Sequence, residues 1–198
     1  MSKPKRLSSG KYMDFDDFTT KDVDIKDIHV SLNNILRFTG HWKEVPPLTV
    51  AQHSWLCYYL ARMDDPENAQ LHLHVFIHDF AEAYVGDVSS PVKWALGKAW
   101  YDFAKPIENI VQEALTIGVP ITPDLHEAVK FYDLAALDIE RRVMWSNQNG
   151  KSNWPDGGLN KTLKEKTDIF NLVASNYDVN IEAIYKELYD LALQTTNP

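Results

Sequence analysis

A histidine and an aspartate stand next to each other in an otherwise apolar stretch of the chain. His78 and Asp79 lie within residues 73–84, and most of the other residues of that segment are hydrophobic, as in a buried helix. Burying an ionised carboxylate costs several kcal/mol unless the carboxylate is paired or binds a metal. The sequence therefore predicts a partner for Asp79, and a divalent cation is one candidate.

The spacing along this segment adds a second acid. On a helix of about 3.6 residues per turn, His78 and Glu82 share one face, and Asp79 is rotated from them by about 100°. Imidazole and carboxylate are typical ligands of first-row divalent metals, which take three or four protein groups. The remaining ligands must come from other helices. His53, near the start of its helix, and Asp133, inside an apolar run, are the best candidates.

Helix start and stop signals follow one another along most of the chain. Thr49 and Gln52 have the spacing of a capping box, and Asp65 is the expected cap of a third helix that carries both His78 and Glu82. Helices are predicted over about 25–37, from 50 onward, and over 66–86, 99–117, 123–145, 160–175 and 179–194. No strand-like alternation longer than a few residues is present. The predicted fold class is all-α, a helical bundle.

Composition limits the classes of protein to consider. The 198 residues, 44% of them hydrophobic, are enough to bury a substantial core as one domain over 1–198, with an N-terminal extension over 1–20 and C-terminal helices of unassigned role over 146–198. The net charge of −8 argues against binding of polymeric nucleic acid.

No apolar run is long enough for a membrane span, and the N-terminus does not resemble a signal peptide, so a cytoplasmic location without membrane association is expected. Cys57 is the only cysteine, and core filling is its expected role.

The order His53, His78-Asp79, Asp133 resembles the H...HD...D signature of HD-domain phosphohydrolases. More of the chain, from about 12 to 145, is similar to small single-domain deoxynucleotide phosphohydrolases, which include 5'-nucleotidases and phage-type dATP triphosphohydrolases. The similar segments are Asp24 to Ile28, Arg37 to His41, Val50 to Ser54, His78 to Tyr84 with Gly86 and Asp87, Pro91 to Lys93, and Asp133 with Ala136, Leu137, Glu140 and Arg141. After about residue 145 the chain departs from this pattern.

The resemblance implies an all-helical enzyme of the HD-domain type that holds one divalent transition metal. It carries the ligand roles over to His53, His78, Asp79 and Asp133. Asp138 is another acid in the same helix as Asp133, but the pattern of Asp, then Ala-Leu, then Glu-Arg aligns Asp133 with the aspartate of the family. Such a donor set suits Co, Mn, Zn, Fe or Ni, and additional Mg²⁺ would accompany the nucleotide.

The resemblance also implies catalytic roles for two acids. It gives Glu82 a general acid/base role and places Asp87 close to the phosphate and the attacking water. Which acid performs which task is left open by the sequence.

Cations near these motifs are candidates for binding phosphate. Arg37 and Lys93 carry the groups that neutralise phosphate oxygens as charge shifts in a transition state. Lys130, one turn before Asp133, is a third candidate, and His41, which follows Gly40 near Arg37, is a candidate substrate contact.

The predicted function is metal-dependent hydrolysis of deoxynucleotides. A dNTP triphosphohydrolase of the dATP type, releasing deoxynucleoside and phosphates, is preferred because of the phage-type resemblance and the number of cations. A 5'-deoxynucleotidase acting on dNMPs is the alternative, and a non-catalytic nucleotide-binding HD sensor is a further one. The sensor would be expected to have lost part of the ligand set or Glu82, which this chain keeps.

A purely structural bundle, in which His78 and Asp79 pair with each other or with Arg141, is the last alternative. The resemblance implies a homo-oligomer with a small-molecule partner, located in the host cytoplasm if the chain is phage-encoded.

Overall fold

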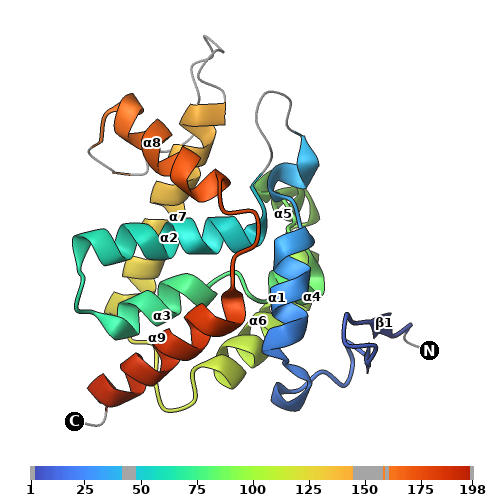
Figure 1. Cartoon of the computed structure of the whole chain (residues 1–198). Helices are drawn as coiled ribbons and strands as arrows, with labels where there is room; N and C mark the ends of the chain where they lie inside the picture. The colour runs from blue at the N-terminus through green and yellow to red at the C-terminus, as the bar shows by residue number, and fades with distance from the viewer. Residues whose placement is uncertain (1–2, 42–47, 145–157, 159–160, 197–198) are drawn as a thin grey trace.

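The computed structural model describes residues 3–41, 48–144, 158 and 161–196. These residues are mostly helical, which confirms the predicted all-α class, and the helices form a single bundle (Figure 1). The β-structure among them is a two-stranded antiparallel sheet and an isolated bridge between Leu36 and Thr49. The elements in chain order are β1 (Lys5–Arg6), β2 (Tyr12–Met13), η1 (Thr20–Asp22), α1 (Ile25–Asn34), η2 (Arg37–Gly40), α2 (Val50–Asp64), α3 (Ala69–Ile77), α4 (Glu82–Val85), α5 (Ser90–Leu96), α6 (Lys98–Leu115), α7 (Pro123–Met144), α8 (Leu163–Ala174) and α9 (Ile181–Thr196).

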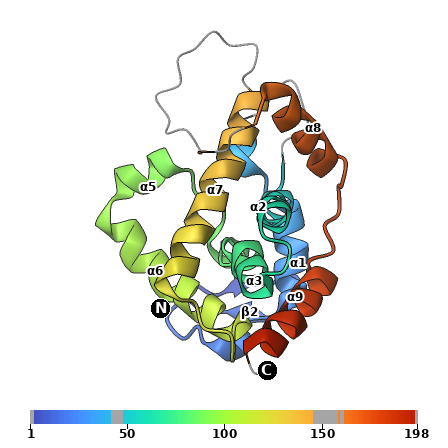
Figure 2. The same cartoon turned by 90° about the vertical axis from the view of Figure 1, so that its left-hand side faces the viewer.

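Helices α2 and α3 form the centre of the bundle. In Figure 2 both are seen nearly end-on, with α1, α7 and α9 around them. Every residue from 71 to 77 in α3 is buried, so this helix has no solvent-facing side. A helix that is buried on all sides must be covered by other elements, and neighbours from both halves of the chain pack on α3.

Local capping signals place the start of α2. Thr49 accepts a hydrogen bond from the backbone N–H of Gln52, and the Gln52 side chain accepts one from the Thr49 N–H, so the predicted capping box is present. This reciprocal cap fixes the first turn, which carries His53.

The third helix differs from its prediction at both ends. It starts after Asn68, whose side chain accepts a hydrogen bond from the Leu71 N–H, whereas Asp65 is the C-cap of α2. It ends at Ile77, and hydrogen bonds spanning three residues, such as Phe80 to Ile77, carry the chain through a tight turn into α4. The prediction that one continuous helix carries 78 and 82 on one face is therefore wrong.

The first helix is also shorter than predicted. It ends at Asn34 rather than near Arg37, and the short helix η2 follows. Phe38 and Thr39 in η2 have φ values of 54° and 57°, in the left-handed region that non-glycine residues rarely adopt. This unusual backbone holds Arg37 beside the centre of the bundle instead of on the surface of α1.

Both ends of the described chain are packed onto the bundle. Lys5 donates to the carbonyl of Tyr84 at 2.7 Å, and Ser8 and Ser9 donate to the buried carboxylate of Asp27. At the other end, α9 packs on α3. Of the predicted C-terminal region over 146–198, residues 146–157, 159–160 and 197–198 lie outside the described residues. Within the described part of the chain, no helix is long and apolar enough to cross a membrane.

Candidate metal centre

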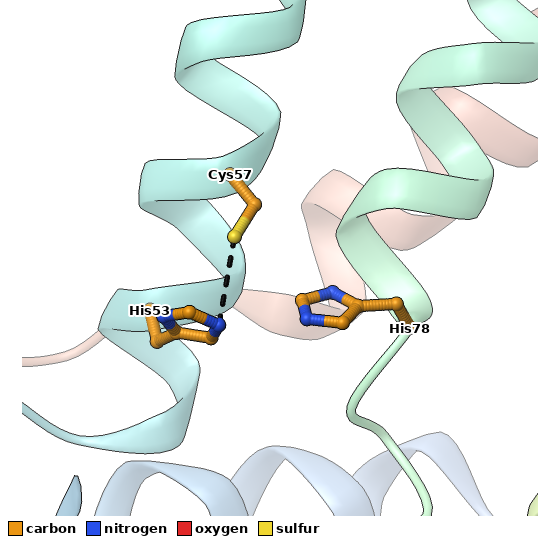
Figure 3. Close-up of side chains that lie close together, drawn as sticks. All are labelled: His53, Cys57 and His78. Carbon is orange, nitrogen blue, oxygen red and sulfur yellow. Dashed lines mark hydrogen bonds between the residues drawn. The ribbon is translucent and has the colours of Figure 1, made fainter. Parts of the chain in front are cut away.

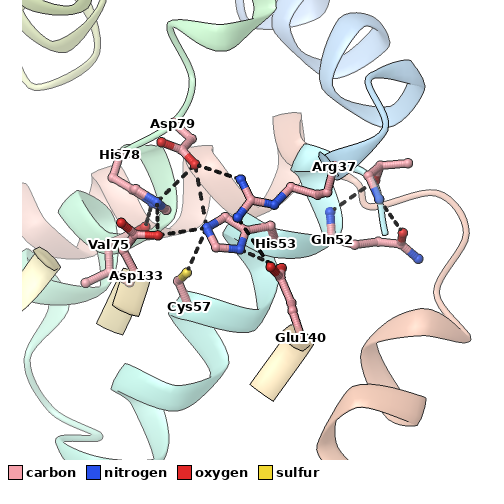
Figure 4. Close-up of polar contacts among 10 residues, drawn as sticks. Arg37, Gln52, His53, Cys57, Val75, His78, Asp79, Asp133 and Glu140 are labelled. Carbon is pink, nitrogen blue, oxygen red and sulfur yellow. Dashed lines mark hydrogen bonds and ion pairs between the residues drawn. The ribbon is translucent and has the colours of Figure 1, made fainter. Parts of the chain in front are cut away.

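The predicted metal ligands, although far apart in sequence, meet inside the bundle. Helix α2 carries His53, the turn after α3 carries His78 and Asp79, and α7 carries Asp133. Figure 4 shows the two imidazoles and the two carboxylates directed toward one another. We refer to these residues as the His–Asp cluster.

The distances within the cluster are short and similar. Nε2 of His53 is 3.5 Å from Oδ2 of Asp79 and 3.2 Å from Oδ1 of Asp133. Nε2 of His78 is 3.3 Å and 3.8 Å from the same two oxygens. His78 and Asp79 would diverge on a continuous helix, and the turn that ends α3 is what allows both to reach one point.

A buried carboxylate fixes the orientation of His53. Oε1 of Glu140, which is fully buried, lies 2.7 Å from Nδ1 of His53. Because an ionised carboxylate only accepts, Nδ1 carries the proton, and the lone pair of the neutral ring is on Nε2, which faces the cluster. The sequence reasoning gave Glu140 no role. Its position seven residues after Asp133, two turns along the same face of α7, is the signal that points to it.

His78 is oriented in the same way by the backbone. Its Nδ1 donates to the carbonyl of Val75 at 2.8 Å, which leaves the lone pair of the neutral ring on Nε2. That Nε2 is buried and has no hydrogen-bond partner among the described residues. Both histidines therefore present an acceptor nitrogen to the same small space.

The spacing of the donor atoms fits a metal ion. Two ligand atoms that each lie about 2.0 to 2.2 Å from a common ion can be no more than about 4.4 Å apart. The four nitrogen-to-oxygen distances of the cluster run from 3.2 to 3.8 Å. The His–Asp cluster thus has the donor types, the tautomers and the spacing that a divalent transition metal needs.

The cluster attracts positive charge. Burial opposes protonation of both histidines, and Arg37 also opposes that of His53, but Cys57 and the nearby carboxylates outweigh these effects and hold the pKa of His53 and His78 well above the usual value. Burial opposes ionisation of the aspartates, yet the imidazoles hold the pKa of Asp79 and Asp133 below the usual range. A proton or a metal cation would satisfy the same field, so a metal that bound here would displace protons.

A cavity of about 330 Å³ opens beside the cluster. Its charged or titratable lining residues are Arg37, His41, Asp79, Glu82, Asp87, Lys93, Asp133 and Arg141. Two members of the cluster thus form part of its wall, and three cationic side chains face the same space. Such a mixture suits an anionic ligand that also contacts a metal.

Arg37 connects this cavity to the buried carboxylates. Its Nη2 is 3.3 Å from Oε2 of Glu140, and its Nη1 is 3.6 Å from Oδ2 of Asp79. Burial would lower the pKa of the Arg37 guanidinium, but these carboxylates raise it. Arg37 therefore stays charged at the cavity wall while it also supports the residue that orients His53.

Glu82 and Lys93 form a second charged pair in the cavity. Nζ of Lys93 is 3.7 Å from Oε1 of Glu82, and Oε2 of Glu82 has no hydrogen-bond partner among the described residues. Burial, and then the charges of Asp79 and Asp87, raise the pKa of Glu82 well above its usual value. A carboxyl group with a raised pKa is suited to give and take protons near neutral pH.

The third cation of the cavity is Arg141 and not the predicted Lys130. Lys130 does not line the cavity that contains Arg37; it lines a separate cavity of about 260 Å³, which also borders Asp79 and Asp133. Arg141, to which the sequence reasoning gave no site role, lines the first cavity instead. Lys130 and Arg141 lie on nearly the same face of α7 but about three turns apart, so they reach different cavities because of their positions along the helix.

Asp138 has a different environment from Asp133. Its buried carboxylate lies 2.6 Å from Nζ of Lys166 and 2.8 Å from Nε of Arg142. These cations hold the pKa of Asp138 below its usual value against the effect of burial. Asp138 therefore joins α7 to α8 and is not part of the His–Asp cluster.

The fold and the site define an all-helical protein with a buried cluster of two histidines and two aspartates beside a partly cationic cavity. The chain is 34% identical over 147 residues to the uncharacterized protein YfdR of Escherichia coli strain K12, covering 74% of each chain. It belongs to the same family as YfdR. It is also 28% identical over 137 residues to the uncharacterized protein RCAP_rcc00048 of Rhodobacter capsulatus, covering 69% of this chain and 70% of that protein. No protein-family model matches the chain. Neither relative's name states an activity, so the family assigns no reaction.

Proposed function

We propose that this protein is a metal-dependent phosphohydrolase of the HD-domain type that acts on deoxynucleotides. The preferred reaction is hydrolysis of a dNTP, of the dATP type, to the deoxynucleoside and phosphates. The observation that carries the proposal is the convergence of two oriented imidazoles and two carboxylates at the wall of a cavity that also contains Arg37, Lys93 and Arg141. A metal site alone would fit many classes of protein, whereas a metal site beside three cations favours a phosphate ester.

The residues that would hold the metal are His53, His78, Asp79 and Asp133. When bound, a divalent cation supplies Lewis acidity for a phosphoryl oxygen and lowers the pKa of water. The remaining work falls to the side chains of the cavity.

The cations of the cavity have the chemistry to bind and orient the phosphate chain. Lys93 and Arg141 come from different elements, α5 and α7, so they approach a ligand from separate directions. Arg37 adds a guanidinium that is fixed by Glu140 and therefore needs no reorganisation when charge shifts during the reaction. These three groups neutralise phosphate oxygens without requiring a basic protein surface, which agrees with the net charge of −8.

Glu82 is the group best suited to move the proton. Its raised pKa, its buried position and its unpartnered Oε2 at the cavity wall support a general acid/base role. Asp87 lines the same cavity and is the second acid of the proposal. In this arrangement Arg37 and then Lys93 limit how far the pKa of Glu82 rises, because their positive charges favour the ionised form.

Product analysis tests the proposal. Metal-loaded protein is incubated with each dNTP and each dNMP, and the products are separated by ion-exchange chromatography. Deoxynucleoside together with triphosphate from a dNTP is the expected result, and Asp79→Asn should abolish it. Asp124→Asn is the matched control, because Asp124 is an exposed acid at the start of α7 outside the cavity and should leave the rate unchanged.

Other outcomes lead to different functions. Orthophosphate from dNMPs alone would replace the proposal by a 5'-deoxynucleotidase. Binding of a dNTP without turnover, with Co²⁺, Mn²⁺, Zn²⁺, Fe²⁺ and Ni²⁺ each tried, would instead support a nucleotide sensor.

A further inference from the structure

Cys57 lies against the His–Asp cluster. It follows His53 by one turn on α2, and its Sγ is 3.6 Å from Nε2 of that histidine. One donor atom from each of His53, Cys57 and His78 can be chosen so that all three lie within 4.8 Å of one another. Figure 3 shows the thiol directed toward the His53 ring, with the His78 ring facing the same space.

This contact is not the one expected of a cysteine that only fills the core. Cys57 is fully buried and belongs to an apolar cluster with residues such as Leu56 and Val75. Its sulfur nevertheless contacts Nε2 of His53, the nitrogen that the metal centre itself uses. The core-filling role predicted for Cys57 from the sequence is therefore incomplete.

The sulfur lies at the separation expected for a ligand. With metal–nitrogen and metal–sulfur distances of about 2.05 and 2.3 Å, two donor atoms on one ion can be no more than about 4.4 Å apart. The separation of Sγ from Nε2 of His53 is 3.6 Å. A second observation points the same way, because Nε2 of His78 is buried in the same space and has no hydrogen-bond partner among the described residues.

We propose that Cys57 is a fifth protein ligand of the metal centre and binds as a thiolate. The inference rests on the metal centre of the proposed function and adds a soft donor to it. On binding, the metal–sulfur bond forms and the proton of the thiol leaves to solvent, so no oxidant or reductant is needed. A six-coordinate ion would keep one position open for water or substrate.

The sulfur ligand changes which metals the site prefers. Thiolate favours Zn²⁺, Co²⁺ and Fe²⁺ over the harder ions Mn²⁺ and Mg²⁺, which favour oxygen ligands. The two histidines and two aspartates alone would discriminate less. Cys57 therefore sets the metal specificity of the site.

Cobalt spectroscopy tests the inference without measuring activity. Bound Co²⁺ gives visible d–d bands with any of these donors, whereas a thiolate adds a sulfur-to-cobalt charge-transfer band in the near ultraviolet. Because Cys57 is the only cysteine of the chain, that band would have a single source. We expect the band in the unmodified protein at one Co²⁺ per chain, and its loss in Cys57→Ser and Cys57→Ala with the d–d bands retained. In competition titrations, Cys57→Ser should lower the ratio of Zn²⁺ to Mn²⁺ affinity by about tenfold or more.

The outcomes separate this inference from the proposed function. Visible d–d bands without the charge-transfer band would overturn sulfur ligation, leave the metal centre intact and reduce Cys57 to a thiol that donates weakly to His53. Absence of all cobalt bands would overturn the metal centre and the inference together. His53→Ala serves as the control, because it should remove the d–d bands as well.

Discussion

Replacing Glu140 with glutamine tests how the protein orients His53 in the proposed metal centre. In the structure, Oε1 of Glu140 accepts from Nδ1 of His53 at 2.7 Å, and Oε2 lies 3.3 Å from Nη2 of Arg37. A glutamine keeps one acceptor for the imidazole, but its amide N–H₂ then faces the guanidinium, donor against donor. The substitution therefore weakens one contact and turns the other into a repulsion.

Both effects have an expected size. Loss of a charged partner behind a ligating histidine lowers metal affinity by about 10- to 100-fold, or about 1.4 to 2.7 kcal/mol. Arg37 is only 9% exposed, so leaving its charge without this partner destabilises the fold by about 3 kcal/mol, the lower end of the range for a broken buried pair, because Asp79 remains nearby.

Two measurements keep these effects apart. Urea unfolding in the presence of a chelator reports the stability of the metal-free protein. Competition with a chromophoric chelator, at a temperature well below the unfolding midpoint, reports metal affinity of the folded variant. Glu127→Gln is the matched control, because Glu127 is exposed on the same helix and should change neither quantity. Unchanged metal affinity in folded Glu140→Gln would refute the assignment of Glu140 as the residue that positions His53.

Three further perturbations test other parts of the structure. Asp138→Ala should destabilise the protein by about 3 kcal/mol in urea unfolding, because it leaves the ammonium of Lys166, itself 4% exposed, without its partner at 2.6 Å; an unchanged midpoint would contradict the buried pair. Adding Zn²⁺ or Co²⁺ at 100 times its dissociation constant should stabilise the fold by about 2.7 kcal/mol, and chelator should reverse the gain; equal melting temperatures in both conditions would argue against a metal centre. The stability contributed by ionised Asp27 should be fully present above its unfolded pKa near 3.8 and be lost as the pH falls through its lower folded pKa, since hydrogen bonds from Ser8 and Ser9 outweigh burial and favour the carboxylate. Asp27→Asn should therefore be less stable than the unmodified protein at neutral pH, and the two unfolding curves should converge in acid; parallel curves at every pH would contradict the assignment.

Several features of this protein follow from the sequence because they depend on neighbouring residues. The capping box of Thr49 and Gln52 fixes the start of α2 through contacts three residues apart, and hydrophobic periodicity is enough to define the all-α class. The choice of His53 as a partner for His78-Asp79 came from residue type, local context and family resemblance, and the structure brings these residues together.

Other features depend on where the helices pack, and local signals do not contain that information. The turn that ends α3 at Ile77 lets the side chains of His78 and Asp79 point to the same place. The sequence gives no sign of this turn, because the apolar run continues past Ile77. Glu140 acquires its contact with His53 because α7 packs against α2.

The positions of the two α7 cations also depend on packing that the sequence does not reveal. Lys130 and Arg141 are both on α7, and only the placement of that helix decides that Arg141 reaches the cavity of Arg37 while Lys130 faces the cavity on the other side. The sequence by itself determined which residue types are available and that the fold is all-α. The tertiary structure decided which of those side chains share one small volume, because that depends on crossing angles and turns set by long-range packing.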